Sequence, residues 1–204
     1  MLRRSAALAA ALLVLAGCAG IGGDDAGTIE AGNLPELVLR PEDLTNADAW
    51  LLFDEGPQAQ ADAPLGPRAD PTRFGRVEGW KARYRRSGTA ATRGPLVVES
   101  RADLFAGEDG AKDDFRAIDD DIEAGRLLTA GERVDVPALG DESVAVTLRQ
   151  GEGSAALRYY LVAWRHDALT ASVLVNGFDQ GTKLADALEL ARKQQLRIQT
   201  ASAE

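Results

Sequence analysis

Apolar and charged residues alternate along two segments in the middle of the chain. From residue 76 to 86 the alternation sets Trp80, Ala82 and Tyr84 against Lys81, Arg83 and Arg85. From residue 96 to 105 it sets Leu96, Val98, Ala102 and Leu104 against Glu99, Arg101 and Asp103. A period of two is typical of a strand with one buried face. Gly and Pro residues lie in the connection over residues 87–95, so the pattern predicts a β-hairpin.

The register of this hairpin follows from its two faces. Matching the apolar faces places Arg83 opposite Glu99 or, one register over, Arg85 opposite Glu99. In either register, acidic residues of the second strand neutralise most of the basic row, through cross-strand pairs that each contribute a few tenths to about 1 kcal/mol. We therefore expect an exposed mixed-charge face, with helices packed on the Trp80/Tyr84 side.

Four further strands are predicted by β-rich runs at residues 50–54, 142–150, 157–164 and 169–175. The last two are joined by a short turn around His166 and Asp167. Residues 34–44 read as an extended segment with a turn at Pro41, and the Pro-rich residues 55–72 as a long surface loop.

Helical spacing appears in two places. Phe115, Ile118 and Ile122 lie on one face of a predicted helix over residues 109–124, followed by Gly125 as a stop. A second helix is predicted over about residues 182–200, with an apolar stripe made of Leu184, Ala187, Leu188, Ala191 and Ile198. Together the elements predict an α+β fold, an antiparallel sheet of about five to six strands with two helices packed on one face.

The N-terminal segment has the features of a targeting sequence and is not expected to be part of the folded domain. Arg3 and Arg4 precede an apolar run, from Ala6 to Leu15, that is too short to span a membrane as a helix. The run ends in Leu15-Ala16-Gly17-Cys18, which resembles the lipobox of a bacterial lipoprotein signal peptide. The resemblance implies that Cys18 is lipidated by acyl chains such as palmitate and becomes the mature N-terminus. The alternatives are a plain secretory signal with a free Cys, and a buried Cys in a cytosolic core.

The organisation that follows is a signal peptide over residues 1–17, a Gly-rich tether over 18–33 and one domain over 34–204. The expected location is the extracytoplasmic face of the cell membrane, and the expected contact with the membrane is the lipid anchor.

The composition of the chain argues against nucleic acid as a partner and against two kinds of metal site. The chain carries a net charge of −9, which argues against a nucleic-acid binder. It has one Cys and one His, which excludes a multi-thiolate or His-rich metal site. We expect no metal and no cofactor.

Few residues offer catalytic chemistry, and we expect no catalytic residue. His166 is the single imidazole, and the pattern places it in an exposed turn, without the rigidly held nucleophile that a Ser–His–acid site needs. The acidic run Asp119-Asp120-Asp121, with Glu123, lacks the Gly and the final Glu of a calcium loop, so we interpret it as a solvated helix face.

The order of elements resembles PsbP-like domains, including actinobacterial LpqN-type lipoproteins and PknH-type extracellular sensor domains. The matching stretches are residues 39–44, 162–165 and 188–195, and the resemblance is one of pattern over most of the domain. It implies a non-enzymatic binding or accessory module and leaves the partner open.

Two hypotheses on function remain. The first is a non-catalytic envelope lipoprotein that binds a small amphiphilic ligand or an envelope protein. Its candidate ligand cleft is the aromatic group Trp80, Tyr84, Tyr159, Tyr160 and Trp164, for which core packing is the alternative. The second is a carboxylate-based envelope hydrolase acting on a glycan, which requires a pocket with two acids at catalytic separation, one of them poorly solvated.

Overall fold

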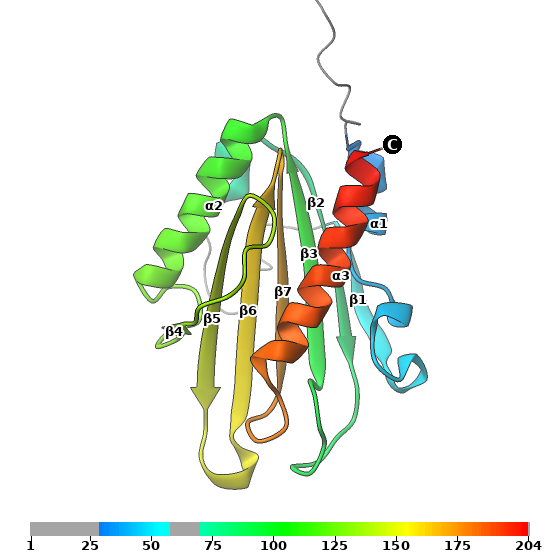
Figure 1. Ribbon diagram of the computed structural model, residues 1–204, viewed down its shortest axis with the longest axis vertical. Helices are drawn as coiled ribbons and strands as arrows, with labels where there is room; N and C mark the ends of the chain where they lie inside the picture. The colour runs from blue at the N-terminus through cyan, green and yellow to red at the C-terminus, as the bar shows by residue number, and fades with distance from the viewer. Residues whose placement is uncertain (1–28, 58–69, 204) are drawn as a thin grey trace, which may run out of the picture.

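A seven-stranded antiparallel sheet forms the centre of the molecule (Figure 1). The computed structural model describes residues 29–57 and 70–203. The strands run in the order β1-β2-β3-β7-β6-β5-β4. Their bounds are β1 Leu51–Pro57, β2 Arg76–Arg85, β3 Val97–Phe105, β4 Glu132–Arg133, β5 Glu142–Gln150, β6 Leu157–His166 and β7 Leu169–Phe178. The α+β class is confirmed, with one strand more than the upper expectation, because β4 is too short to give an alternating pattern.

Three helices pack on this sheet: α1 Leu34–Leu37, α2 Glu108–Glu123 and α3 Leu184–Ser202. The two long helices begin and end within two residues of their predicted bounds. They do not share a face, however, and this part of the expectation is wrong. On β6, Val162 and Trp164 pack in one cluster with α3, whereas Leu161 and Ala163 pack in another with α2. Because β6 is apolar on both faces, it accepts a helix on each side.

The charged row of β2 faces away from α3, as expected, but it lies on the sheet face that carries α2, which was not expected. Its register is the first of the two predicted. Arg83 lies opposite Glu99, and Lys81 lies opposite Arg101. The expected exposure is wrong, because Lys81, Glu99, Arg101 and Asp103 are only 2–6 % exposed.

Ion pairs explain why this burial is tolerated. Glu99 binds both Arg101 and the Nε of Arg83, the latter at 3.0 Å. The edge strand β1 adds Asp54, whose carboxylate lies 3.0 Å from the Nζ of Lys81. The hydrogen bond from Lys81 is the main reason that the pKa of Asp54 lies below its ordinary value. The partner from β1 could not be read from the hairpin alone, since the sheet order is a tertiary property.

The segment before β1 is more compact than its sequence suggested. Residues 34–37 form α1 and not part of an extended segment, and the turn predicted at Pro41 is the 3-10 turn η2, Pro41–Asp43. Leu34, Leu37 and Leu39 are buried in the cluster beneath α3. Ile29 and Ala31 also pack against this cluster, so the fold includes residues that the sequence placed in the tether.

Several expectations lie outside the described residues. These are the signal peptide, Cys18 with most of the tether, and residues 58–69 of the predicted loop. The flanks of that loop are described: β1 continues to Pro57, and a 3-10 turn, η5, covers Pro71–Phe74. In the part of the chain that the structure describes, no helix is long and apolar enough to cross a membrane.

Candidate functional site

Four of the five aromatic residues of the predicted cleft lie in or against one apolar cluster under α3, and the fifth lies on the other face of the sheet. Tyr84 and Trp164 are 2 % and 0 % exposed in the core under α3, and Trp80 and Tyr160 pack at the margin of that core. Tyr159 packs on the opposite face, beside α2, because neighbouring residues of a strand point to opposite sides. None of the five lines any of three cavities that the described residues form. Core packing, the alternative left open by the sequence, describes Tyr84 and Trp164.

Burial also governs the chemistry of Tyr84. Its hydroxyl donates a 2.8 Å hydrogen bond to the carbonyl of Leu39, and desolvation raises the pKa of Tyr84 to about 12. The phenol is therefore protonated across the physiological range and serves to hold the segment after α1 against the sheet.

His166 is the last residue of β6 and not a free turn residue. It pairs with Leu169 across the hairpin, and the turn itself is Asp167 and Ala168. Its side chain is 18 % exposed and lines a cavity of about 460 Å³ near the end of α3. Ser202 lines the same cavity, but its hydroxyl donates to the carbonyl of Ile198, and no hydrogen bond joins it to His166 in the described chain.

The acidic run on α2 is only partly a solvated face. Asp120 is exposed, and Asp119 pairs with Arg133 at 2.5 Å. Asp121 is 4 % exposed, and its carboxylate binds Arg126 at 2.6 Å, which closes the end of the helix. Among residues 29–57 and 70–203, no group of three or more metal-ligating side chains comes together.

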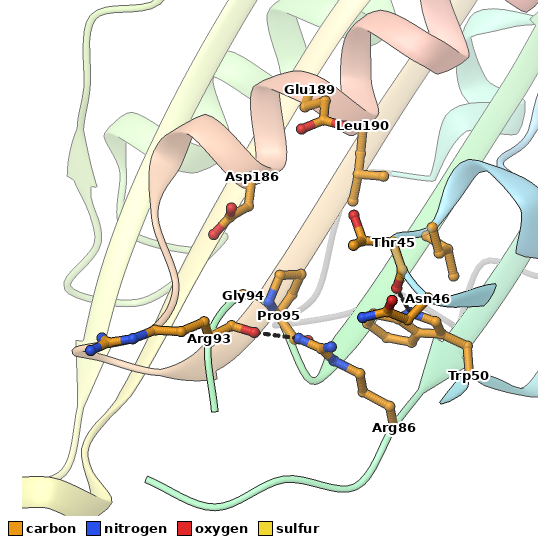
Figure 2. Close-up of a pocket in the computed structure, with 11 residues that line it drawn as sticks. Thr45, Asn46, Trp50, Arg86, Arg93, Gly94, Pro95, Asp186, Glu189 and Leu190 are labelled. Carbon is orange, nitrogen blue, oxygen red and sulfur yellow. Dashed lines mark hydrogen bonds between the residues drawn. The ribbon is translucent and has the colours of Figure 1, made fainter. Parts of the chain in front are cut away.

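A cavity of about 310 Å³ lies beside the first turns of α3, where three segments distant in sequence meet (Figure 2). One wall is α3, a second is the connection between β2 and β3, and the third is the segment from Leu44 to Trp50. The apolar part of its lining consists of Leu44, Trp50, Pro95 and Leu190. The polar part consists of Thr45, Asn46, Arg86, Arg93, Asp186 and Glu189.

The connection between β2 and β3 is fixed against the turn that precedes α3. The amide of Gly94 donates a 2.9 Å hydrogen bond to the carbonyl of Gly181, and Arg93 donates through Nη1 to the carbonyl of Gln180, also at 2.9 Å. A Cβ at Gly181 would collide with the carbonyl oxygen of Thr92, so the close approach requires glycine. This wall of the cavity is therefore held in place independently of any ligand.

The segment from Leu44 to Trp50 is fixed at both ends. Before it, Asp43 receives a bidentate contact from Arg197 of α3, with Nη2 at 2.9 Å and 3.1 Å from its two oxygens. At its end, the indole Nε1 of Trp50 donates to the carbonyl of Thr45 at 3.0 Å. Asn46 has a φ of 58°, a left-handed conformation that asparagine tolerates, and it starts the 3-10 turn η3, Ala47–Ala49.

Arg86 is the most constrained charged group on this cavity. Its Nε donates to the carbonyl of Pro95 at 2.7 Å and its Nη2 to the carbonyl of Arg93 at 2.5 Å. Its guanidinium also lies over the ring of Trp50, 5.0 Å from the centroid. Such a stacked, hydrogen-bonded guanidinium loses little further freedom when it binds an anion.

The acidic groups on α3 are also held locally. The carboxylate of Asp186 accepts a 2.8 Å hydrogen bond from the amide of Lys183, which caps the start of the helix. Glu189 pairs with Lys193 one turn further along, at 3.0 Å, in the i, i+4 spacing that brings two side chains together on a helix. Within the described chain, no ion pair crosses the cavity from these acids to Arg86 or Arg93.

Local sequence patterns gave no signal for this cavity. Its walls come from three segments whose meeting depends on the sheet order and on the path of α3. Gly94 and Pro95 were recognisable only as turn residues, and Trp50 only as the first residue of a strand. Two arginines in a Gly- and Pro-containing connection of a strongly acidic chain are the one feature that could have drawn attention.

Comparisons with known proteins support the fold. No family model matches the chain, and no curated protein matches it in sequence. Among solved structures, the extracellular domain of PknH from Mycobacterium tuberculosis is similar in fold. The match has a TM-score of 0.63 at 13 % sequence identity and covers 86 % of this chain and 99 % of that domain. At this identity the similarity establishes a shared architecture, in agreement with the resemblance seen in the sequence.

Proposed function

We propose that this protein is a non-catalytic, lipid-anchored binding module on the extracytoplasmic face of a bacterial cell membrane, and that its ligand occupies the cavity beside α3. The observation that carries this proposal is the lining of the cavity. Apolar side chains and a few fixed polar groups converge on a space of about 310 Å³. Small-molecule sites have this composition, with volumes from roughly 300 to 1,000 Å³.

The acids of the cavity favour binding over hydrolysis. A carboxylate-based hydrolase needs one acid in a poorly solvated environment. Glu189 has a side chain that is 62 % exposed and is paired with Lys193. Asp186 is only half-buried, and its carboxylate caps the helix. These environments support a role in ligand recognition for both groups.

The fold and the N-terminal sequence support the location. The architecture is that of a domain described as extracellular in PknH. The lipobox-like residues before Cys18 are typical of lipoproteins, and two or more acyl chains anchor a protein stably whereas one does so marginally. The partner remains a small ligand or an envelope protein, with no role for nucleic acid.

Native mass spectrometry of the detergent-purified protein tests the ligand. We expect a small molecule from the envelope to be retained, and we expect Thr45→Trp, which fills the cavity from an exposed position, to abolish retention. Thr129→Trp is the matched control, because Thr129 is also exposed but lies outside the cavity. Equal retention by both variants, or no retained molecule in the unmodified protein, would contradict the proposal.

Fractionation tests the anchor separately. Cys18→Ser removes the acylated thiol, so the protein should leave the membrane fraction or accumulate with its signal peptide attached. Metabolic labelling with palmitate should mark the unmodified protein and not the variant. A Cys18→Ser protein that is processed normally and still needs detergent for extraction would exclude the lipid anchor.

A further inference from the structure

Opposite charges face each other across the cavity beside α3 without pairing. Figure 2 shows Asp186 and Glu189 on α3, on one side of the space, and Arg86 and Arg93 from the β2–β3 connection, on the other. In a protein with a net charge of −9, two arginines at such a place would be expected to find carboxylate partners. Within the described residues, neither arginine has a carboxylate oxygen within 4.0 Å.

Neutral groups hold the two arginines in position. Arg86 donates to the carbonyls of Pro95 and Arg93 and stacks on Trp50. Arg93 donates to the carbonyl of Gln180. Carbonyl oxygens orient a guanidinium but carry no net charge, so the positive charge of this wall is not compensated. Arg86 lies closer to the centre of the space, whereas the guanidinium of Arg93 points outward (Figure 2).

On the opposite wall, the two acids are not equivalent. The charge of Glu189 is offset by Lys193, 3.0 Å away. Asp186 accepts a hydrogen bond from a backbone amide and has no cationic side chain within 4.0 Å in the described chain. Asp186 therefore provides the uncompensated negative charge, and Arg86 the best-positioned positive charge.

From this arrangement we infer that the ligand is a small zwitterion of the amino-acid type. Its anionic group binds the Arg86 wall, its ammonium group binds the Asp186 wall, and an apolar part packs between Trp50, Pro95 and Leu190. This inference rests on the proposed function and specifies its ligand class. A purely anionic ligand would bring negative charge close to Asp186 and leave this acid without a partner. A purely cationic ligand would do the same to Arg86 with positive charge. The volume of about 310 Å³ suits a molecule of this size and not a whole lipid.

Three probes of the same shape and different charge test the ligand class. Phenylalanine carries both charges, 3-phenylpropionate lacks the ammonium group, and 2-phenylethylamine lacks the carboxylate. By isothermal titration calorimetry on the detergent-purified protein, phenylalanine should bind at least about tenfold more tightly than either analogue, since each lost charged hydrogen bond costs that factor or more. An analogue that binds as tightly as phenylalanine overturns the inference.

Two variants assign the groups. Asp186→Asn should remove the preference for phenylalanine over 3-phenylpropionate, while its amide oxygen still caps Lys183. Arg86→Gln should remove the preference over 2-phenylethylamine. Arg86→Lys, which restores the charge, should recover part of that preference and guards against a mere loss of structure. Arg192→Gln, exposed on α3 and outside the cavity, should behave as the unmodified protein.

The outcomes separate this inference from the proposed function. One result would overturn the ligand class alone: none of the three probes binds, but native mass spectrometry shows an uncharged or singly charged molecule whose retention Thr45→Trp abolishes. The ligand would then not be a zwitterion, and the proposed binding function would be supported. If the variants change no preference, Asp186 and Arg86 are not the recognising groups. If no probe binds and no molecule is retained, both the zwitterionic ligand and the proposed binding function are contradicted.

Discussion

The indole Nε1 of Trp164 donates a 2.6 Å hydrogen bond to the side-chain oxygen of Gln195 in the middle of the core. Trp164 is 0 % exposed and Gln195 is 4 % exposed. The neighbouring Gln194 accepts a 2.8 Å hydrogen bond from the hydroxyl of Ser100 and donates to the carbonyl of Arg101, also at 2.8 Å. Two glutamines thus tie α3 to β6 and β3, and they fix how the helix crosses the sheet.

Gln195→Met should destabilise the fold by about 1–3 kcal/mol, because it leaves the buried indole N–H without a partner. Urea unfolding measures the change, and Gln199→Met, at an exposed position of the same helix, should change stability by less than about 0.5 kcal/mol. Combining Gln195→Met with Trp164→Phe removes both partners, so the double variant should lose less than the sum of the single losses. Additive losses would mean that the hydrogen bond contributes little.

These glutamines also show which features of the structure the pattern of apolar and polar residues could not predict. Alternation along β2 and β3 correctly predicts both strands and limits their register to two possibilities, of which the structure has the first, because the apolar residues at every second position must share one face. Helical spacing likewise predicts α2 and α3. It misses Gln194 and Gln195, which complete the buried stripe of α3, because a polar residue counts as exposed unless its partners are known. It misses the cavity beside α3 for the same reason, since three distant segments form it.

The buried charges on β2 and β3 give a second prediction. Glu99 is 2 % exposed and binds Arg83 and Arg101. Glu99→Gln should destabilise the protein by about 3–5 kcal/mol, since removal of one partner leaves buried positive charge without compensation. Arg85→Ala, on the same face of β2 but exposed, should cost less than about 0.5 kcal/mol. Equal losses in thermal or urea unfolding would show that this face is as well solvated as the sequence first suggested.

Asp179 links stability to pH. The pKa of Asp179 lies below its ordinary value of 3.8, chiefly because Arg149 donates a hydrogen bond to its carboxylate at 2.9 Å, with Arg158 at 2.7 Å adding to the effect. The folded state therefore binds the proton less tightly than the unfolded state does. This contribution is fully present above about pH 4 and is lost as the pH falls through the folded-state pKa.

Asp179→Asn should accordingly lower the free energy of unfolding at pH 7 and make less difference at pH 3. Unfolding in urea at the two pH values measures both losses. Asp120→Asn, an exposed acid on α2, is the control and should give no pH-dependent difference. A loss for Asp179→Asn that is the same at pH 3 and pH 7 would mean that its charge does not contribute.

Asp43 connects stability to the cavity beside α3. Its carboxylate receives Arg197 in bidentate contact and also accepts from the amide of Arg40 at 2.8 Å, while its carbonyl accepts from Lys193 at 2.7 Å. Asp43→Ala should destabilise the fold by about 2–3 kcal/mol, because it removes the carboxylate's hydrogen bonds with Arg197 and with the amide of Arg40, which are only partly exposed. It should also weaken ligand retention, because the contact with Arg197 is lost and the hydrogen bond from Lys193 to the backbone carbonyl of residue 43 is then the remaining direct bond from this residue to α3. The neighbouring Glu42 provides the control, since its side chain is 63 % exposed and its oxygen lies 3.8 Å from Arg197. If Glu42→Ala weakens retention as much as Asp43→Ala does, the effect comes from negative charge near α3 and not from the attachment of the cavity wall.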